Sequence, residues 1–270
     1  MFSRKGTVME SKDERREFEN PHAEVHEDEQ PQNQKTNLVA ALEGRAQFFS
    51  LIASLFYRPL TQEQIDNIAA MDLSAYAGLN ETFDSGINDM SRYLRKRNTG
   101  TREQLATDFT STFIGTKTYE GKSAVPYESV FTNEDGLMCQ ESFHQVRATY
   151  RKAAFRKREG DSIPDDHMGY MCEFISVLSK RAASEIEAGN TEAAARDLTL
   201  TRDFLNQHIL SWYDQLAERA SHIVSTRFYR GVLSLAEGYF AFDASIADDL
   251  IAAAAGLTPR KTRRGRRSER

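Results

Sequence analysis

The chain has 270 residues, a net charge of −5 and two cysteines, Cys139 and Cys172. Two cysteines outside a CxxC arrangement argue against a disulfide framework or a zinc site, and both stretches read as helix, where a cysteine is usually a small apolar core residue. No run of about 18 apolar residues predicts a membrane span, and the charged first residues exclude a signal peptide. We therefore expect a cytoplasmic protein.

Both ends of the chain are charged and poor in apolar residues. Residues 1–36 are expected to be disordered, because they cannot bury enough surface to offset the entropy of ordering. Residues 259–270 form a basic tail, which is either a flexible solubilising segment or a contact for nucleic acid or acidic lipid. The acidic body between these tails can steer a basic partner towards it.

Between the tails, apolar residues recur at helical spacing. The first half predicts a helix over residues 38–56 that Pro59 stops, and another over residues 87–94. Two Thr-x-x-Gln sequences have the form of a capping box and predict further helix starts: Thr61 with Gln64, and Thr101 with Gln104. A loop with two glycines follows, from Gly115 to Pro126.

The second half opens with a short extended or turn-like segment, residues 127–131. Five helices are predicted after it: one near Gln140, one opening at residues 164–167 and ending at Gly189, one from Thr191 through Leu216, and a last pair over residues 226–239 and 243–255. Residues 157–162 between the first two are charged and read as a loop.

This pattern contains no strand-period alternation of useful length and no repeat. It predicts an all-α, two-lobed helical bundle, with lobes at residues 37–114 and 131–258 joined by a hinge at residues 115–130. Such a hinge would permit lobe exchange between two chains, giving a domain-swapped homodimer. The alternative is an ordinary ordered loop in a monomer.

Signals for catalysis or metal binding are lacking. Glu141 and His144 form one Glu-x-x-His pair, whereas a di-iron bundle uses two. The sequence has no phosphate-cradling glycine loop, no nucleophile elbow and no dinucleotide fingerprint. We expect no enzymatic activity, no metal and no cofactor.

Two clusters remain as candidate binding elements. Residues 164–167, Pro-Asp-Asp-His, place two carboxylates at a predicted helix start, where they either cap the helix or form an acidic rim for a basic peptide. Residues 126–131, Pro-Tyr-Glu-Ser-Val-Phe, put aromatic rings beside a carboxylate. They suit either a peptide groove or a buried linker whose rings plug the core between the lobes.

Five elements in order resemble the TorD/DmsD/NarJ family of molybdoenzyme maturation chaperones, over residues 40–250. They are residues 109–115, residues 125–131, residues 163–168, Glu173-Phe174, and the spaced Phe204, His208, Trp212 and Phe228-Tyr229. The resemblance implies an all-helical TorD-like chaperone that binds the twin-arginine signal peptide or the apo-catalytic subunit of a molybdopterin oxidoreductase. It would hold this client until cofactor insertion is complete, before export.

The resemblance also implies where the client binds. The implied rim is Pro164, Asp166 and His167, with Asp165 between them; Tyr127, Glu128 and Ser129 join it, and Phe109 and Phe113 line an apolar wall. One departure is Ile163, which stands where the family usually has Glu and removes a carboxylate from the rim. The alternative function is a helical regulatory module that binds nucleic acid through the basic tail.

Overall fold

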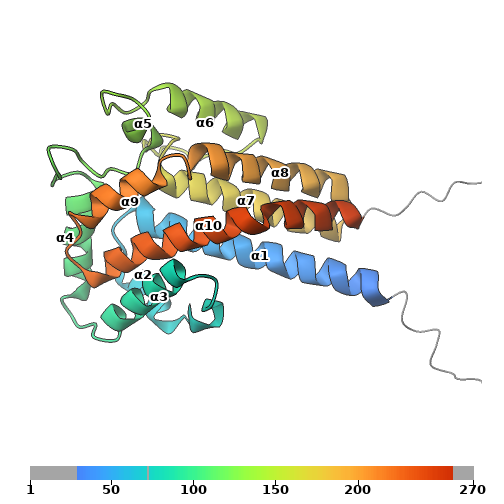
Figure 1. The fold of residues 1–270 in the computed structure, drawn as a ribbon, viewed down its shortest axis with the longest axis horizontal. Coiled ribbons are helices and arrows are strands. Elements are labelled where there is room, and N and C mark those ends of the chain that lie inside the picture. The colour runs from blue at the N-terminus through green and yellow to red at the C-terminus, as the bar shows by residue number, and fades with distance from the viewer. Residues whose placement is uncertain (1–28, 72, 258–270) are drawn as a thin grey trace, which may run out of the picture.

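The computed structural model describes residues 29–71 and 73–257, and the regular elements among them are all helices (Figure 1). They are α1 Glu29–Tyr57, α2 Gln62–Ala70, the short 3₁₀ helix η1 Leu73–Tyr76, α3 Glu81–Leu94, α4 Thr101–Phe113, α5 Glu128–Phe131, α6 Glu141–Lys152, α7 Met168–Glu187, α8 Thr191–His208, α9 Tyr213–Ser221 and α10 Arg227–Gly256. The all-α prediction is confirmed. The predictions for residues 1–28 and for the basic tail at residues 259–270 lie outside the described residues.

Helix α1 begins at Glu29, so residues 29–36 are helical rather than disordered as expected. Its first turns are fixed by the neighbouring helix, because Lys35 Nζ donates to the carbonyl oxygen of Glu187 at the end of α7 (3.0 Å). A cation there also interacts favourably with the negative end of the helix dipole. Residues 29–36 thus have a partner in α7, a helix far along the chain, and the local sequence does not predict this contact.

The core face of α1 is strongly apolar. Within the described residues, Gln32–Tyr57 is the stretch with the length and hydropathy that a membrane crossing needs, and half of its most apolar window is buried inside the bundle. Phe49, Ile52 and Phe56 are fully buried there. Packing against α7, seen in Figure 1, accounts for this composition.

Helix α10 is one continuous element, where the sequence predicted two helices. Its backbone packs directly against the backbone of α3. A Cβ on Gly86 of α3 would lie 2.4 Å from the backbone nitrogen of Leu235, and one on Gly231 would lie 2.7 Å from the carbonyl oxygen of Gly86. The same holds at Gly238, whose carbonyl also accepts a hydrogen bond from Asn80 Nδ2 (2.8 Å). Glycine is required on both helices for this approach.

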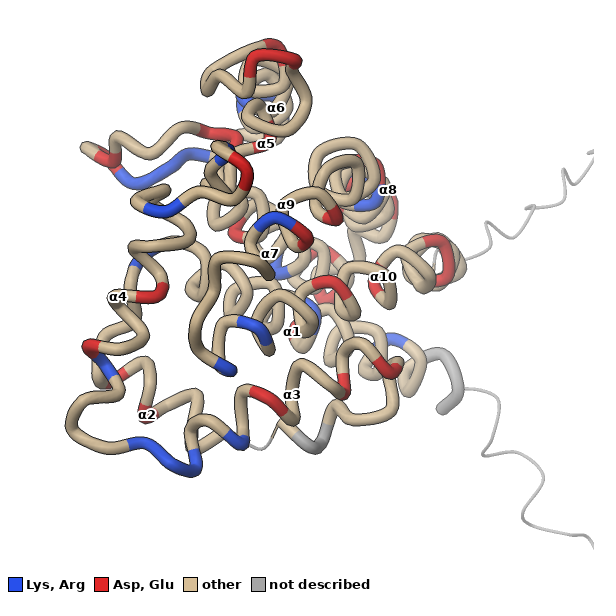
Figure 2. The backbone as a smooth tube through the Cα atoms, turned by 60° about the vertical axis from the view of Figure 1, so that its left-hand side comes forward, with Lys and Arg blue, Asp and Glu red and all other residues tan. Residues whose placement is uncertain are grey.

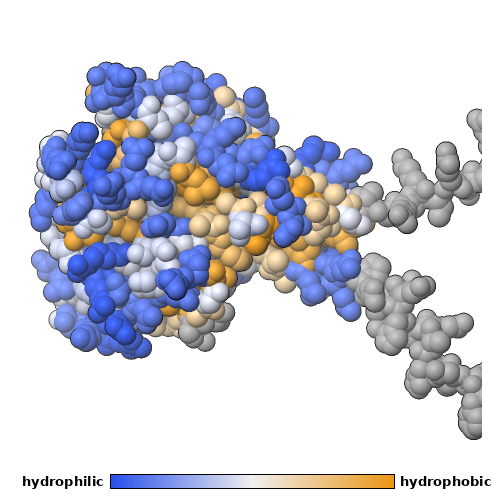
Figure 3. Space-filling view, in the orientation of Figure 1, coloured by the Kyte–Doolittle hydropathy of each residue, from blue (hydrophilic) through white to orange (hydrophobic). Residues whose placement is uncertain are grey.

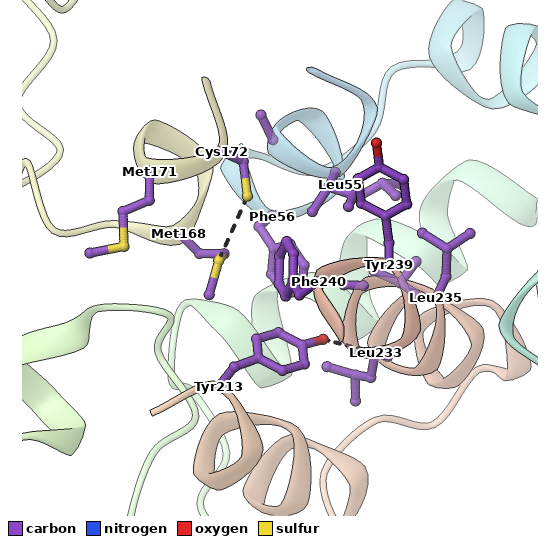
Figure 4. Packing of buried hydrophobic residues seen from close by; sticks show 14 of the residues in the cluster. Leu55, Phe56, Met168, Met171, Cys172, Tyr213, Leu233, Leu235, Tyr239 and Phe240 are labelled. Carbon is purple, nitrogen blue, oxygen red and sulfur yellow. Dashed lines mark hydrogen bonds between the residues drawn. The ribbon is translucent and has the colours of Figure 1, made fainter. Parts of the chain in front are cut away.

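The larger buried cluster takes side chains from both predicted lobes. Figure 4 shows Phe56 of α1 facing Met168 and Cys172 of α7, whose sulfurs lie 3.8 Å apart. Tyr213 of α9 closes the other side and donates to the carbonyl oxygen of Leu233 (2.8 Å). The hinge at residues 115–130 therefore joins two stretches of chain that share one hydrophobic core. Its role as a hinge stays a prediction.

A buried ion pair ties four helices together beside this core. The guanidinium of Arg45 in α1 donates to both carboxylate oxygens of Asp243 in α10 (2.7 and 2.8 Å). It also donates to the hydroxyls of Ser179 in α7 (2.6 Å) and Thr201 in α8 (3.2 Å). The guanidinium is thus hydrogen-bonded to one carboxylate and two hydroxyls, which is the condition under which a buried charge is tolerated.

Several local predictions meet different outcomes. The capping box of Thr61 and Gln64 is confirmed. Thr101 is not a cap, because Gly100 holds that position and the Thr101 hydroxyl accepts from the backbone nitrogen of Asn98 (2.8 Å). The helix predicted from Thr191 through Leu216 is broken between α8 and α9. Cys172 is buried as expected, whereas Cys139 is exposed outside any helix with φ of 59°.

Hydrophilic residues cover most of the face seen in Figure 3, and more apolar colour runs through its middle over α10. The polar cover is densest around α6 and around α2 and α3, which stand at opposite edges of the bundle in this view.

Candidate functional site

The two segments singled out in the sequence lie side by side. The backbone nitrogen of Glu128 donates to the carbonyl oxygen of Asp166 (3.0 Å), and that of Met168 donates to the carbonyl oxygen of Pro126 (2.9 Å). Between these bonds Tyr127 and His167 form an antiparallel bridge. We call the paired residues 126–129 and 164–168 the signature junction. It fastens the exit of the interlobe loop to the start of α7.

Asp166 is fully buried at the centre of this junction. Its Oδ2 accepts from the backbone nitrogen of Ser129 (3.0 Å) and from the Ser129 hydroxyl (2.5 Å), while Oδ1 is buried with no partner among the described residues. Burial raises the pKa of the Asp166 carboxyl above its usual range, against the lowering effect of the Ser129 bonds. The Ser129 hydroxyl also accepts from the backbone nitrogen of Cys139 (3.0 Å).

His167 is the N-cap of α7, so this helix begins at Met168 rather than at Pro164 as the sequence predicted. The reason is the extended backbone of His167, which the bridge to Tyr127 holds in place. Its Nδ1 accepts from the backbone nitrogen of Gly169 (3.0 Å). Burial lowers the pKa of His167 to about 3, so the imidazole is neutral at pH 7.

Glu128 is held by a histidine from a distant helix. His208, at the end of α8, places Nδ1 3.1 Å from both carboxylate oxygens of Glu128, and both side chains are buried. Burial raises the pKa of the Glu128 carboxyl, and the bond to His208 opposes that rise. The sequence matched His208 to a family pattern but gave it no place in the site.

Asp165 already has cationic partners. Lys157 Nζ lies 2.8 Å from one of its carboxylate oxygens and Arg147 Nε lies 3.7 Å from the other. The Tyr150 hydroxyl donates to its carbonyl oxygen (3.1 Å). Lys157 also donates to the carbonyl oxygen of Ile163 and lies over the ring of Tyr170. The acidic start of this segment is therefore neutralised from within the chain.

Phe109 and Phe113 are core residues in this structure. Both are buried, and their rings meet each other and the rings of Phe56 and Tyr229. Seven of the nine predicted site residues are thus buried inside the chain, and the other two, Tyr127 and Pro164, are half-buried. The two predicted clusters do come together, but into a packed junction rather than an open rim.

An open groove of about 540 Å³ adjoins the junction, between the end of α1, the start of α7 and the loop at residues 158–161. We call it the α1–α7 groove. Tyr57 and Gly169 line it and connect it to the junction, because a Cβ on Gly169 would lie 3.1 Å from both the Tyr57 ring and His167 Nδ1. Three carboxylates line the groove: Glu159, Asp161 and Glu173.

Asp161 is an enclosed carboxylate, with a side chain that is 7% exposed. One of its oxygens accepts from the backbone nitrogen of Ile163 (3.1 Å), and the other lies 3.5 Å from the guanidinium of Arg58. Arg58 is mostly exposed and also lies over the ring of Tyr57. The hydroxyls of Tyr57 and Tyr170 are 3.1 Å apart, and burial together with Asp161 raises the pKa of Tyr170.

The sequence did not identify Tyr57 or Asp161 as site residues. Asp161 falls in the predicted charged loop at residues 157–162, and Tyr57 lies just beyond the helix predicted over residues 38–56. The available signal was Pro59, which ends α1 close to Tyr57, but only the pairing of α1 with α7 brings that end to the loop. Within the described residues, no three His, Cys, Asp or Glu side chains are grouped as metal ligands.

Comparison with known proteins gives consistent matches. A family model described as the nitrate reductase delta subunit matches residues 77–218, which include the whole signature junction. Chaperone protein TorD of Vibrio vulnificus is 25% identical over 208 residues, covering 74% of this chain and 93% of that protein. Those of Vibrio cholerae (26% over 221 residues; 77% and 94%) and Aliivibrio salmonicida (24% over 198 residues; 70% and 88%) match similarly.

Proposed function

The chain belongs to the nitrate reductase delta subunit family, and we propose that it is a non-catalytic, TorD-like chaperone acting in the cytoplasm on a molybdopterin oxidoreductase. Its client would be the twin-arginine signal peptide, the apo-catalytic subunit, or both. The chaperone would hold this client until cofactor insertion is complete, before export. The observation that carries the proposal is the α1–α7 groove, which opens directly beside the signature junction.

Three carboxylates and two arginines, Arg58 and Arg158, line the groove, and its net negative charge suits an incoming arginine. Asp161 is enclosed enough to interact strongly with a guanidinium, yet its present partner Arg58 is exposed and 3.5 Å away. A contact of this kind contributes little, about 0–1 kcal/mol. An incoming arginine can therefore replace Arg58 on Asp161 and gain a charge-assisted hydrogen bond, while Glu173 and Glu159 remain for its neighbour.

The apolar stretch of such a peptide also has a place to lie. Ala53, Tyr57 and Pro59 line the groove along the end of α1. A helical client segment packed there would extend the bundle by one amphipathic helix. Micromolar affinity requires only about 8 kcal/mol, which one anchored arginine and a few buried side chains can supply while still permitting release.

In this proposal the signature residues act chiefly by positioning the groove. Asp166 and Ser129 fasten the two segments, and His167 caps α7 where Gly169 meets Tyr57. The predicted direct contacts of Tyr127, Glu128, Asp166 and His167 with client would require the junction to open. Their effect on binding is therefore expected to pass through groove geometry.

Calorimetric titration with a synthetic peptide tests the proposal. The peptide carries two adjacent arginines followed by a leucine-rich stretch, and a matched peptide carries two lysines. We expect Asp161→Asn with Glu173→Gln to weaken arginine-peptide binding about tenfold. We also expect the lysine peptide to bind more weakly to the parent protein, because lysine keeps the charge but lacks the bidentate fork.

Asp249→Asn with Glu192→Gln is the matched control, since both carboxylates are exposed, on α10 and α8, and neither has an ion pair among the described residues. Unchanged affinity of the Asp161 and Glu173 variant would move the client elsewhere on the molecule. Equal binding of both peptides, lost together as salt rises, would leave only non-specific attraction by the acidic body.

A further inference from the structure

Another open cavity, of about 560 Å³, lies between the end of α3, the start of α4 and the start of α10. Four of its lining residues are cationic: Arg92, Arg95, Lys96 and Arg227. The others are Tyr93, Asn98, Thr101 and Gln104, so no carboxylate lines it. The cavity shares no lining residue with the α1–α7 groove. In a chain with a net charge of −5, this is a local concentration of positive charge.

The cations of this cavity are largely free to meet a ligand. Arg92, Arg95 and Lys96 are exposed and form no ion pair within the part of the chain that the structure describes. Arg227 donates to Asp89 through Nε (2.8 Å), which leaves its terminal nitrogens available. Figure 2 shows a blue stretch of backbone beyond the end of α3, next to α2. Like charges gathered in this way repel one another until an anion joins them.

The start of α4 faces the same cavity. Its N-cap is Gly100, which offers no side chain to accept from the first turn. Thr101 and Gln104 of that turn line the cavity, whereas Glu103 does not. The backbone N–H groups of Thr101 and Gln104 already donate to the carbonyl oxygens of Asn98 (3.1 Å) and Gly100 (3.0 Å), so this turn contributes the positive end of the helix dipole, which favours an anion. Cationic side chains and a helix start therefore converge on one hollow from separate elements.

We propose that this cavity binds a small ligand that carries two or more phosphate groups. Its volume falls in the range of about 300–1,000 Å³ that small-molecule sites have. Arginine forks can take phosphate oxygens in pairs, Lys96 adds a compact charge, and the start of α4 adds the positive end of its helix dipole. A concave site with charges on several sides fits a compact polyanion better than an extended acidic peptide, which needs a long track of cations.

Inorganic pyrophosphate is the probe, titrated calorimetrically into the full chain at low salt. The variant is Arg95→Gln with Lys96→Gln, both of which are exposed side chains. The control is Lys180→Gln with Arg196→Gln, exposed on α7 and α8, which changes the net charge equally. We expect pyrophosphate to bind the parent and the control alike, and the Arg95 and Lys96 variant to bind at least tenfold more weakly. Amide shifts at Tyr93 and Thr101 should accompany binding.

Circular dichroism shows whether the variant remains folded. If it does not, Arg92→Gln alone with the same titration takes its place. Equal weakening in the variant and the control, or no measurable binding to the parent, overturns the proposal. So does binding of citrate as tight as that of pyrophosphate, because the site would then lack phosphate selectivity. Tighter binding of a hexaglutamate peptide would make the cavity part of an acidic-protein surface and would also overturn it.

Discussion

Ser129 donates two hydrogen bonds to the same oxygen of Asp166, one from its backbone nitrogen and one from its hydroxyl. The other oxygen of Asp166 is buried without a partner among the described residues. One carboxylate thus holds together two segments that are 37 residues apart in the chain.

Asp166→Ala should lower both client affinity and stability. The substitution leaves the Ser129 nitrogen and hydroxyl buried without their acceptor, which costs about 1–3 kcal/mol. Asp166→Asn keeps an acceptor of the same shape and should be milder, because the carboxyl it replaces has a raised pKa. Thermal unfolding followed by circular dichroism measures the stability of both variants. An alanine variant that melts with the parent would mean that the junction is not fastened through Asp166.

His167 should make the protein less stable as the pH falls below about 6.5. The folded-state pKa is about 3, so between these values the unfolded chain binds a proton at this residue that the folded chain does not. One such group contributes a slope of about 1.4 kcal/mol per pH unit, with stability rising as the pH rises. The loss is complete only when the pH passes below the folded-state value.

His167→Asn tests this, because asparagine can cap a helix without titrating. Urea unfolding at several pH values should show a shallower pH dependence for this variant than for the parent. His144→Asn is the control, since His144 is exposed on α6. Parallel curves for the parent and the His167 variant would contradict the prediction.

Gly86→Ala should destabilise the protein strongly, because the added Cβ would meet the backbone of α10 at 2.4 Å and neither backbone can yield alone. Gly44→Ala in α1 is a matched control, since nothing lies within 4 Å of its added Cβ. Alanine there should stabilise by about 0.5–1 kcal/mol through helix propensity. Urea unfolding of the two variants should move in opposite directions, and equal shifts would mean that α3 and α10 are not in backbone contact.

Shortening the predicted hinge at residues 115–130 should increase any lobe-exchanged dimer. Two contacts anchor the loop to α9. Arg219 donates to the carbonyl oxygen of Ser123 (2.8 Å), and the ring of Tyr119 stacks on His222 at the end of α9. Deleting residues 117–122 removes the turn and strains the closed form. Light scattering at high concentration measures the dimer, and a strictly monomeric profile for both chains would exclude exchange.

Local signals predicted the fold well where a few neighbouring residues decide the outcome. The Thr61–Gln64 box is such a case. The same residue pair at Thr101 and Gln104 does not form a capping box, because the Thr101 hydroxyl accepts from the backbone nitrogen of Asn98 instead. The order of helices and the family resemblance are likewise readable from the sequence.

The site was predicted only in part. Spacing and resemblance identified the two segments of the signature junction, but not that Asp166 and Ser129 would satisfy each other inside it. Which face of a segment is buried depends on partners far along the chain. The α1–α7 groove was missed for the same reason, since Tyr57 and Asp161 meet only through the packing of two helices.

The close contact of α3 with α10 bears on how the chain is made. Helix α10 is the last described element to leave the ribosome. Its glycines nevertheless form the surface on which α3, one of the first elements to be made, packs. Until α10 arrives, the face of α3 that carries Phe83 and Met90 lacks its main partner, although Phe83 also meets the ring of Phe48 in α1. A nascent chain therefore cannot complete its core domain by domain. A protein proposed to bind incompletely folded clients must therefore itself be synthesised through α10 before its own core is complete.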